Sequence, residues 1–129
     1  MTRRVLIPPG LEAACDAVGM SPGVVSHNHV FMTGVTGAAA DGTMPVSEEA
    51  QFHACFTKIG EVLAQADLTL NAVVEMTSYH VGLHAHFDAF DAVRRAHLSQ
   101  PYPAWTAVEV AGLRREGAVV EIRIVAELG

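Results

Sequence analysis

The segment from residue 101 to residue 122, PYPAWTAVEVAGLRREGAVVEI, constrains the fold most strongly, because it holds two strand-like runs joined by a charged turn. Side chains along both runs alternate between two faces, the period that is typical of a half-buried strand. We therefore predict two antiparallel strands with one apolar face and one face that carries Trp105, Glu109, Glu121 and Arg123. An aromatic ring beside a carboxylate and a guanidinium suits a small-molecule pocket. The alternative is a half-buried sheet face with a structural ion pair.

The length and composition of the chain suit one domain over residues 1–129, since half of these residues are apolar. The formal net charge of −6 argues against binding to nucleic acid, whose phosphates require a basic face. Cys15 and Cys55 show neither CxxC spacing nor a disulfide framework, and Cys55 lies in an apolar stripe, which predicts a buried free thiol. No apolar run has membrane-spanning length, and we expect no signal peptide because no segment has a proper h-region. We expect a reduced, cytoplasmic protein without nucleic-acid or membrane partners.

Local patterns predict the elements in the order ββ(β)-α-β-α-β-β. Ser47 is an N-cap candidate for the clearest helix, and Glu48 and Glu49 place negative charge in its first turn. The remaining assignments are an edge strand at 3–7, a loop with one helical turn at 11–20, a hairpin at 24–32 whose turn uses Asn28, a strand at 73–81 and a helix at 87–98.

This order of elements predicts an α+β fold. Two helices from separated positions must cover one face of the sheet, which gives a two-layer domain with a six-stranded, mostly antiparallel sheet. The other face also carries apolar side chains, among them Tyr79, Val81, Ala107, Val119 and Val125. Because nothing in the chain is left to cover that face, we expect further copies of the chain to do so.

Several motifs, in order and at matching distances, resemble the Rid family (reactive intermediate deaminases, YjgF-like). They are Met32-Thr33-Gly34, Ala50-Gln51, Phe87-x-x-Phe90, the run PAWTAVEVA at 103–111 and Val120-Glu121-Ile122. The resemblance extends from about Ser21 to Leu128. It implies a chorismate-mutase-like fold, assembly as a homotrimer, and small-molecule pockets in the clefts between subunits.

The resemblance also implies a chemistry. In active Rid deaminases an arginine grips the carboxylate of a 2-imino acid, and a glutamate positions the water that attacks the imine carbon. Glu121 matches that glutamate, so its implied role is water-positioning or general base; a charge cluster with Arg123 or Glu109 is the alternative. Thr33 and Gly34 match the small polar turn beside the ligand, and an ordinary strand end is their alternative.

Four positions depart from the resemblance. Trp105 stands where active members have the arginine, and it offers one neutral donor in place of a charged planar fork. Gly23 replaces a tyrosine, Asp91 an asparagine and Ala107 a cysteine. These substitutions predict a less cationic, more aromatic pocket.

Arg123 is a candidate to replace the missing charge. It lies two residues after Glu121 and so on the same strand face. Our hypothesis is that Arg123 lends its charge to a repositioned ligand acid while Trp105 stacks on a flat ligand. A simple ion pair with Glu121 or Glu109 is the alternative.

The histidines suggest a metal site only weakly. His27 and His29 form one close pair and His84 and His86 another, but no carboxylate or cysteine is spaced to complete either set. We expect surface histidines, no bound metal and no cofactor.

Two functions remain open for a chain of this kind. One is hydrolysis of the imine or enamine of a small carboxylic acid, although not broad 2-imino acid deamination. The other is a non-catalytic trimer that binds a small metabolite, which an indole in the pocket favours. Endoribonuclease or translation-inhibitor activity, a label given to some Rid proteins, is a remote third.

Overall fold

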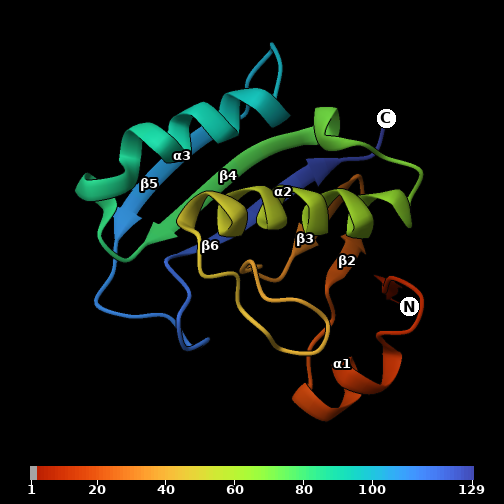
Figure 1. Cartoon of the computed structure of the whole chain (residues 1–129). Helices are drawn as coiled ribbons and strands as arrows, with labels where there is room; N and C mark the ends of the chain where they lie inside the picture. The colour runs from red at the N-terminus through yellow and green to blue at the C-terminus, as the bar shows by residue number, and fades with distance from the viewer. Residues whose placement is uncertain (1–2) are drawn as a thin grey trace.

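The computed structural model describes residues 3–129, which form a six-stranded sheet with two long helices on one face (Figure 1). The strands are β1 Arg4–Leu6, β2 Gly23–Ser26, β3 His29–Met32, β4 Val73–His80, β5 Ala104–Glu109 and β6 Val120–Glu127. The helices are α1 Glu12–Val18, α2 Glu48–Ala64 and α3 Leu83–His97, with a 3-10 turn, η1, at Leu70–Ala72. The predicted α+β class and its two-layer arrangement are confirmed. Helix α1 is longer than the single turn expected there.

The strands lie in the order β1-β2-β3-β6-β4-β5, and all pairings are antiparallel except that of β4 with β5. The predicted hairpin between the strands of segment 101–122 is therefore wrong, because β4 lies between β5 and β6. Helix α3 carries the chain from the end of β4 back to its start, so β5 runs parallel to β4. The chain then returns along the other side of β4 as β6.

This topology changes which side chains share a face. Trp105 pairs with Met76 and therefore faces the helices, whereas Glu121 pairs with Tyr79 and Arg123 with Thr77 on the opposite face. The alternation within each strand was predicted correctly. The common face for Trp105, Glu109, Glu121 and Arg123 was wrong, because it assumed that β5 and β6 are neighbours.

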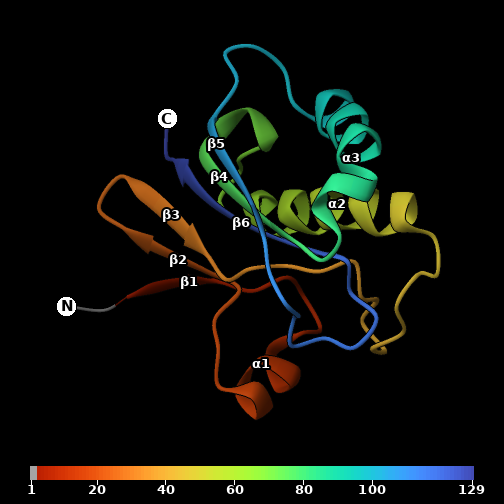
Figure 2. The ribbon, with the colours of Figure 1, turned by 90° about the vertical axis from the view of Figure 1, so that its left-hand side faces the viewer.

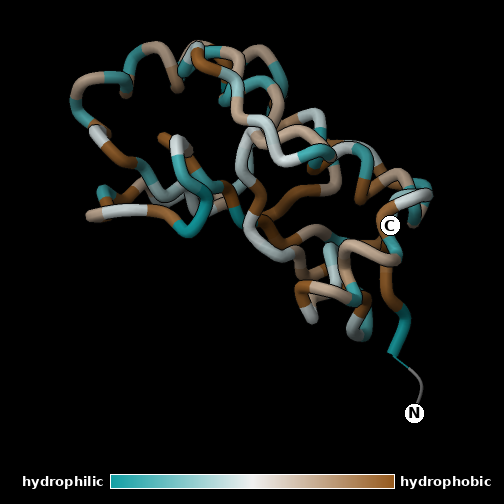
Figure 3. The backbone as a smooth tube through the Cα atoms, turned by 60° about the horizontal axis from the view of Figure 1, so that its bottom comes forward, coloured by the Kyte–Doolittle hydropathy of each residue, from teal (hydrophilic) through white to brown (hydrophobic). Residues whose placement is uncertain are grey.

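The core lies between the sheet and the pair α2 and α3, which lie together on one side of it, with α1 apart (Figure 2). The apolar stripe of α2 is buried as expected, and the Ser47 hydroxyl caps this helix by accepting the Ala50 N–H at 3.2 Å. In Figure 3 hydrophobic stretches run through the centre of the molecule and hydrophilic ones recur at its outer turns. The largest fully buried side chains include Phe52, Phe56, Phe90, Ile59, Leu63, Met76, Ile122 and Ile124.

In the described part of the chain no helix covers the opposite sheet face, here called the open face (Figure 2). Cross-strand pairs place on it Val5, Val24, Phe31, Val125, Arg123, Glu121, Thr77, Tyr79, Thr106 and Val108. Phe31 is 41% exposed. Ala107, which we had placed on this face, pairs with Ser78 and faces α3 instead, for the same topological reason as Trp105.

Two smaller expectations concern turns and membranes. The turn between β2 and β3 is present, but His27 and not Asn28 adopts the left-handed conformation, with φ of 52°. Asparagine is the commoner residue there, but histidine also tolerates that region. Among residues 3–129 no helix is both long and apolar enough to cross a membrane.

Candidate functional site

Glu121 lies on the open face, half-buried, with its carboxylate against the backbone of Gly34. A Cβ at Gly34 would overlap Oε2 of Glu121, so only glycine permits this approach. The neighbouring Thr33 donates its hydroxyl proton to the Ser21 carbonyl at 2.7 Å and its N–H to the Pro22 carbonyl at 3.0 Å. Gly34 thus lies against Glu121, whereas the hydroxyl proton of Thr33 is already used within the protein.

The segment after Gly34 is fixed from α2. The Lys58 ammonium donates to the carbonyls of Thr36 at 2.8 Å and Ala38 at 2.9 Å, and burial lowers the pKa of Lys58. Cys55, predicted to be a buried thiol, is buried and contacts the Val35 carbonyl at 3.6 Å. Burial raises the pKa of Cys55 to about 12, so this thiol is no nucleophile.

Gln51 connects the same region to β6. Its side-chain amide donates to the carbonyls of Pro45 at 2.9 Å and Gly117 at 3.0 Å, and its oxygen accepts the Val119 N–H at 2.9 Å. The side chain is buried and all of these partners are backbone groups. Gln51 therefore fixes the position at which β6 begins, and so helps to place Glu121, the second residue of that strand.

The charge-cluster alternative for Glu121 is not what the structure shows. Within residues 3–129 neither Glu121 nor Arg123 takes part in an ion pair. Glu109 faces the other way and its Oε1 accepts the Leu83 N–H at 3.0 Å, at the start of α3. Arg123 shares the open face with Glu121, as the sequence predicted.

Trp105 belongs to a second cluster, on the helix side of edge strand β5. Its indole N–H donates to Oγ of Ser78 at 2.9 Å, and its ring stacks on Phe87 at 5.7 Å with an interplanar angle of 6°. The Arg94 guanidinium carbon lies 4.0 Å from the centre of the indole. Much of the ring is thus already in contact with α3, which leaves less of it to stack on a ligand.

Asp91 holds that guanidinium in place. Its carboxylate accepts from Arg94 Nε at 3.1 Å and from Arg95 Nε at 3.1 Å. The hydrogen bond from Arg94 is the largest cause that lowers the pKa of Asp91 below 3.8. The aspartate neutralises the one cation beside Trp105 within residues 3–129, so this cluster carries little free positive charge.

Gly23 belongs to neither cluster. It pairs with Met32 on the helix side of the sheet, and a Cβ there would lie 2.9 Å from Cγ1 of Val62 and 3.3 Å from Cβ of Leu6. Gly23 is therefore a packing position without room for a larger side chain.

Sequence reasoning missed Arg94 and Ser78 altogether, and it did not connect His80 with His86. The three-residue spacing of Asp91 and Arg94 on a helix was a usable signal for the first. Ser78 and His80 fall on the buried phase of β4, and both are fully buried. His86, considered with His84 as a metal pair, is buried while His84 is exposed. Within residues 3–129 no three His, Cys, Asp or Glu side chains come close enough to hold a metal ion.

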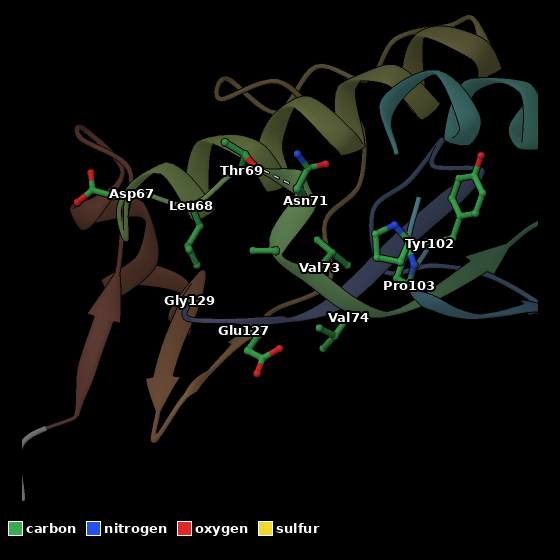
Figure 4. A pocket seen from close by; sticks show the side chains of 12 residues that line it. Asp67, Leu68, Thr69, Asn71, Val73, Val74, Tyr102, Pro103, Glu127 and Gly129 are labelled. Carbon is green, nitrogen blue, oxygen red and sulfur yellow. Dashed lines mark hydrogen bonds between the residues drawn. The ribbon is translucent and has the colours of Figure 1, made fainter. Parts of the chain in front are cut away.

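Two surface grooves are lined by other residues. One, of about 710 Å³, runs where β4 begins and β6 ends, and its lining includes Asn71, Val74, Tyr102 and Glu127 (Figure 4). The other, of about 260 Å³, lies between α2 and α3 and includes His53 and Ala92. None of the predicted site residues lines either groove. The Glu121 cluster and the Trp105 cluster also lie on opposite faces of one chain's sheet, so a single chain does not bring them together.

Comparison with known proteins shows the family. The family model described as Endoribonuclease L-PSP matches residues 12–128. The RutC family protein YjgH of Escherichia coli K12 is 28% identical over 127 residues, which cover 98% of this chain and 95% of that protein.

Solved structures agree with that match. A structure of a protein named YjgH has a TM-score of 0.90 at 27% identity, covering 99% of this chain and 98% of the other. RidA from an Antarctic Psychrobacter has a TM-score of 0.79 at 32% identity, covering 84% and 87%. A YjgF/YER057c/UK114 family member from Mycobacterium tuberculosis has a TM-score of 0.81 at 26% identity, covering 98% and 100%. The chain belongs to the Endoribonuclease L-PSP family, that is, the Rid or YjgF-like family.

Proposed function

We propose that this Rid-family protein forms a homotrimer that binds a small carboxylic acid, or its imine or enamine, in clefts between subunits. The observation that carries the proposal is the placement of Glu121 against Gly34 on an open face that carries exposed Phe31. A carboxylate on such a face becomes part of an enclosed pocket when another copy covers it. The separation of the Glu121 and Trp105 clusters within one chain supports the same arrangement, since neighbouring copies could unite them.

Within that pocket Glu121 would position or deprotonate the water that attacks an imine carbon. An imine is already electrophilic, so orientation and one proton-handling group account for most of the catalysis required. Arg123, which is on the same face and forms no ion pair within residues 3–129, is available to bind the acid group of the ligand.

A non-catalytic metabolite-binding trimer is the second candidate, and the Trp105 cluster favours it. The indole N–H is used by Ser78 and the Arg94 charge by Asp91, so this part of the site lacks a free group to grip a 2-imino acid. Endoribonuclease activity has the family description behind it, but the net charge of −6 opposes binding of RNA phosphates.

The two free thiols, Cys15 and Cys55, suit a reducing compartment, so the proposed location of the protein is the cytoplasm.

An imine-hydrolysis assay tests the proposal, with imino acids generated in situ by an amino-acid oxidase. If the protein is a deaminase, Glu121→Ala lowers the rate about a hundredfold or more, while Glu127→Ala, an exposed change on the same strand, leaves it unchanged. A wild type that does not accelerate hydrolysis but binds small carboxylic acids saturably is the binding protein. A wild type that neither accelerates hydrolysis nor binds small carboxylic acids would refute both the deaminase and the binding protein.

A further inference from the structure

A chain of hydrogen bonds crosses the molecule from Trp105 to the start of α2. The indole N–H of Trp105 contacts Ser78 Oγ at 2.9 Å, and Ser78 Oγ contacts Nε2 of His80 at 2.8 Å. Nδ1 of His80 contacts Nε2 of His86 at 2.9 Å, and Nδ1 of His86 contacts Oε2 of Glu48 at 3.1 Å. We call Ser78, His80, His86 and Glu48 the relay.

The relay is buried except at its far end. Ser78 and His80 have no exposed surface and His86 has 4%, whereas the Glu48 side chain is 52% exposed. Aromatic rings enclose the histidines: Phe90 lies edge-on to His80 at 4.6 Å, and Phe52 lies edge-on to His86 at 5.1 Å. Within residues 3–129 the side chains of Ser78, His80 and His86 hydrogen-bond only to one another, to the indole and to Glu48, so a change at one is passed to the next.

Elementary hydrogen-bond rules fix the direction of every link when both histidines are neutral. The Glu48 carboxylate only accepts, so Nδ1 of His86 carries the proton and its Nε2 accepts from His80. Nε2 of His80 must then accept the Ser78 hydroxyl proton, and Ser78 Oγ accepts the indole N–H. One arrangement satisfies every group in the line.

Protonation of His86 reverses part of this arrangement. Nε2 of a charged His86 is a donor and would face the N–H of His80, so His80 must change tautomer and donate to Ser78 through its Nε2. Ser78 Oγ then accepts from both the indole and His80, and its own proton must turn elsewhere. A proton taken up beside the exposed Glu48 therefore alters the group that holds the indole.

We propose that Ser78, His80 and His86 are positioning residues that couple the indole of Trp105 to proton uptake at the His86–Glu48 pair. As far as it concerns ligand binding at Trp105, this inference rests on the proposed function. Ser78 itself is no nucleophile, because it is fully buried and its oxygen accepts the indole N–H.

The other charged and titratable groups near the relay are few, and each must be considered as a separate source of pH dependence. His86 meets Glu48 from α2 and His80 from β4; on α3 His84 and Asp88 lie two residues away and are exposed, and from β5 Glu109 binds the Leu83 N–H. At the other end the indole meets the Arg94 guanidinium and through it Asp91, whose pKa the hydrogen bond from Arg94 lowers below 3.8, well under the range of pH 5.5 to 8 that we would measure.

Trp105 is the chain's one tryptophan, so fluorescence of the ligand-free protein reports on the relay directly. We expect the wild-type emission to change between pH 5.5 and 8. Glu48→Gln removes the carboxylate that accepts from Nδ1 of His86 and should move the midpoint of the emission change to lower pH by about half a unit to one unit. Glu49→Gln, the matched control on the next residue, removes an anion that lies near His53 and should leave the midpoint unchanged. Ser78→Ala should abolish the change.

Emission that stays constant with pH in the wild type, or a midpoint that Glu48→Gln and Glu49→Gln move equally, would overturn the inference. Far-UV circular dichroism of each protein confirms that the fold persists across the range. Because no ligand is present, the result is independent of the imine assay. A relay that responds in a protein without hydrolytic or binding activity would refute the proposed function alone.

Discussion

At the level of single residues, the side chains around Trp105 fix its indole ring, and Arg94 is the charged one among them. The guanidinium lies 4.0 Å from the indole centre and is anchored by Asp91. Restoring an arginine at position 105 would therefore place two guanidinium groups side by side. The substitution that looks like a repair from the sequence is expected to be harmful in this environment.

We predict that Trp105→Arg lowers the free energy of unfolding by about 2 kcal/mol or more, through lost packing and charge repulsion. Adding Arg94→Gln removes the repulsion, so the double variant should be more stable than the sum of the single effects by about 1 kcal/mol. Urea denaturation of the four proteins measures this coupling.

Arg95→Gln is the control for that cycle, because Arg95 also binds Asp91 but has no contact with the indole. Its coupling to Trp105→Arg should be close to zero. Equal coupling for Arg94 and Arg95 would show that the arrangement around the indole does not matter. The effect of an arginine at position 105 on imine hydrolysis is best measured in the double variant, because Arg94→Gln removes the charged neighbour of that arginine.

At the level of elements, β4 and α3 pack together through the buried His80 and His86. Because His80 is buried, the free energy of unfolding depends on pH. Burial lowers the pKa of His80 to about 4 from 6.5, with His86 as a smaller cause. Below pH 6.5 His80 therefore binds a proton in the unfolded chain but stays largely neutral in the folded chain until the pH approaches 4. The contribution of His80 to stability is complete above pH 6.5 and is lost as the pH falls towards 4, to an extent of order 3 kcal/mol.

Urea unfolding at pH 7 and at pH 5 checks this prediction. His80→Gln should flatten the pH dependence, even though it lowers stability at both values, while His29→Gln, an exposed change in β3, should leave the slope unchanged. His97 adds a loss of the same sign, because burial and His53 lower its pKa as well. A slope that survives in His80→Gln would assign the effect to other groups.

The elements also show how far sequence reasoning reaches. Periodicity predicted α2 with its Ser47 cap, the burial of Cys55 and the alternation along β5 and β6, because each depends on local geometry. Which strands are neighbours is decided by the whole chain, and the mistaken β5–β6 pairing placed Trp105 and Glu121 on one face. Within the candidate site, the family motifs singled out Glu121 and Gly34, which lie against each other, whereas Arg94 and the relay depend on packing that no pattern at one position reveals.

At the level of the whole molecule, the open face is what assembly would cover. Phe31 is 41% exposed there and pairs with Val125. We predict that the wild type sediments with three times the 13.7 kDa mass of the chain, and that Phe31→Glu yields monomers at micromolar concentration, because a carboxylate cannot be buried unpaired. Val46→Glu, at a fully exposed site outside the sheet, should still give trimers. A monomeric wild type would contradict the prediction.

The strand order has a consequence for how the molecule is made. Strand β6 is last in the sequence, yet it lies between β3 and β4 in the middle of the sheet. Until a ribosome has released that strand, the β1–β3 ribbon and the β4–α3–β5 unit have no strand to join them, and each exposes an unpaired edge. The growing chain must therefore keep two partial sheets from pairing with the wrong neighbours until β6 joins them.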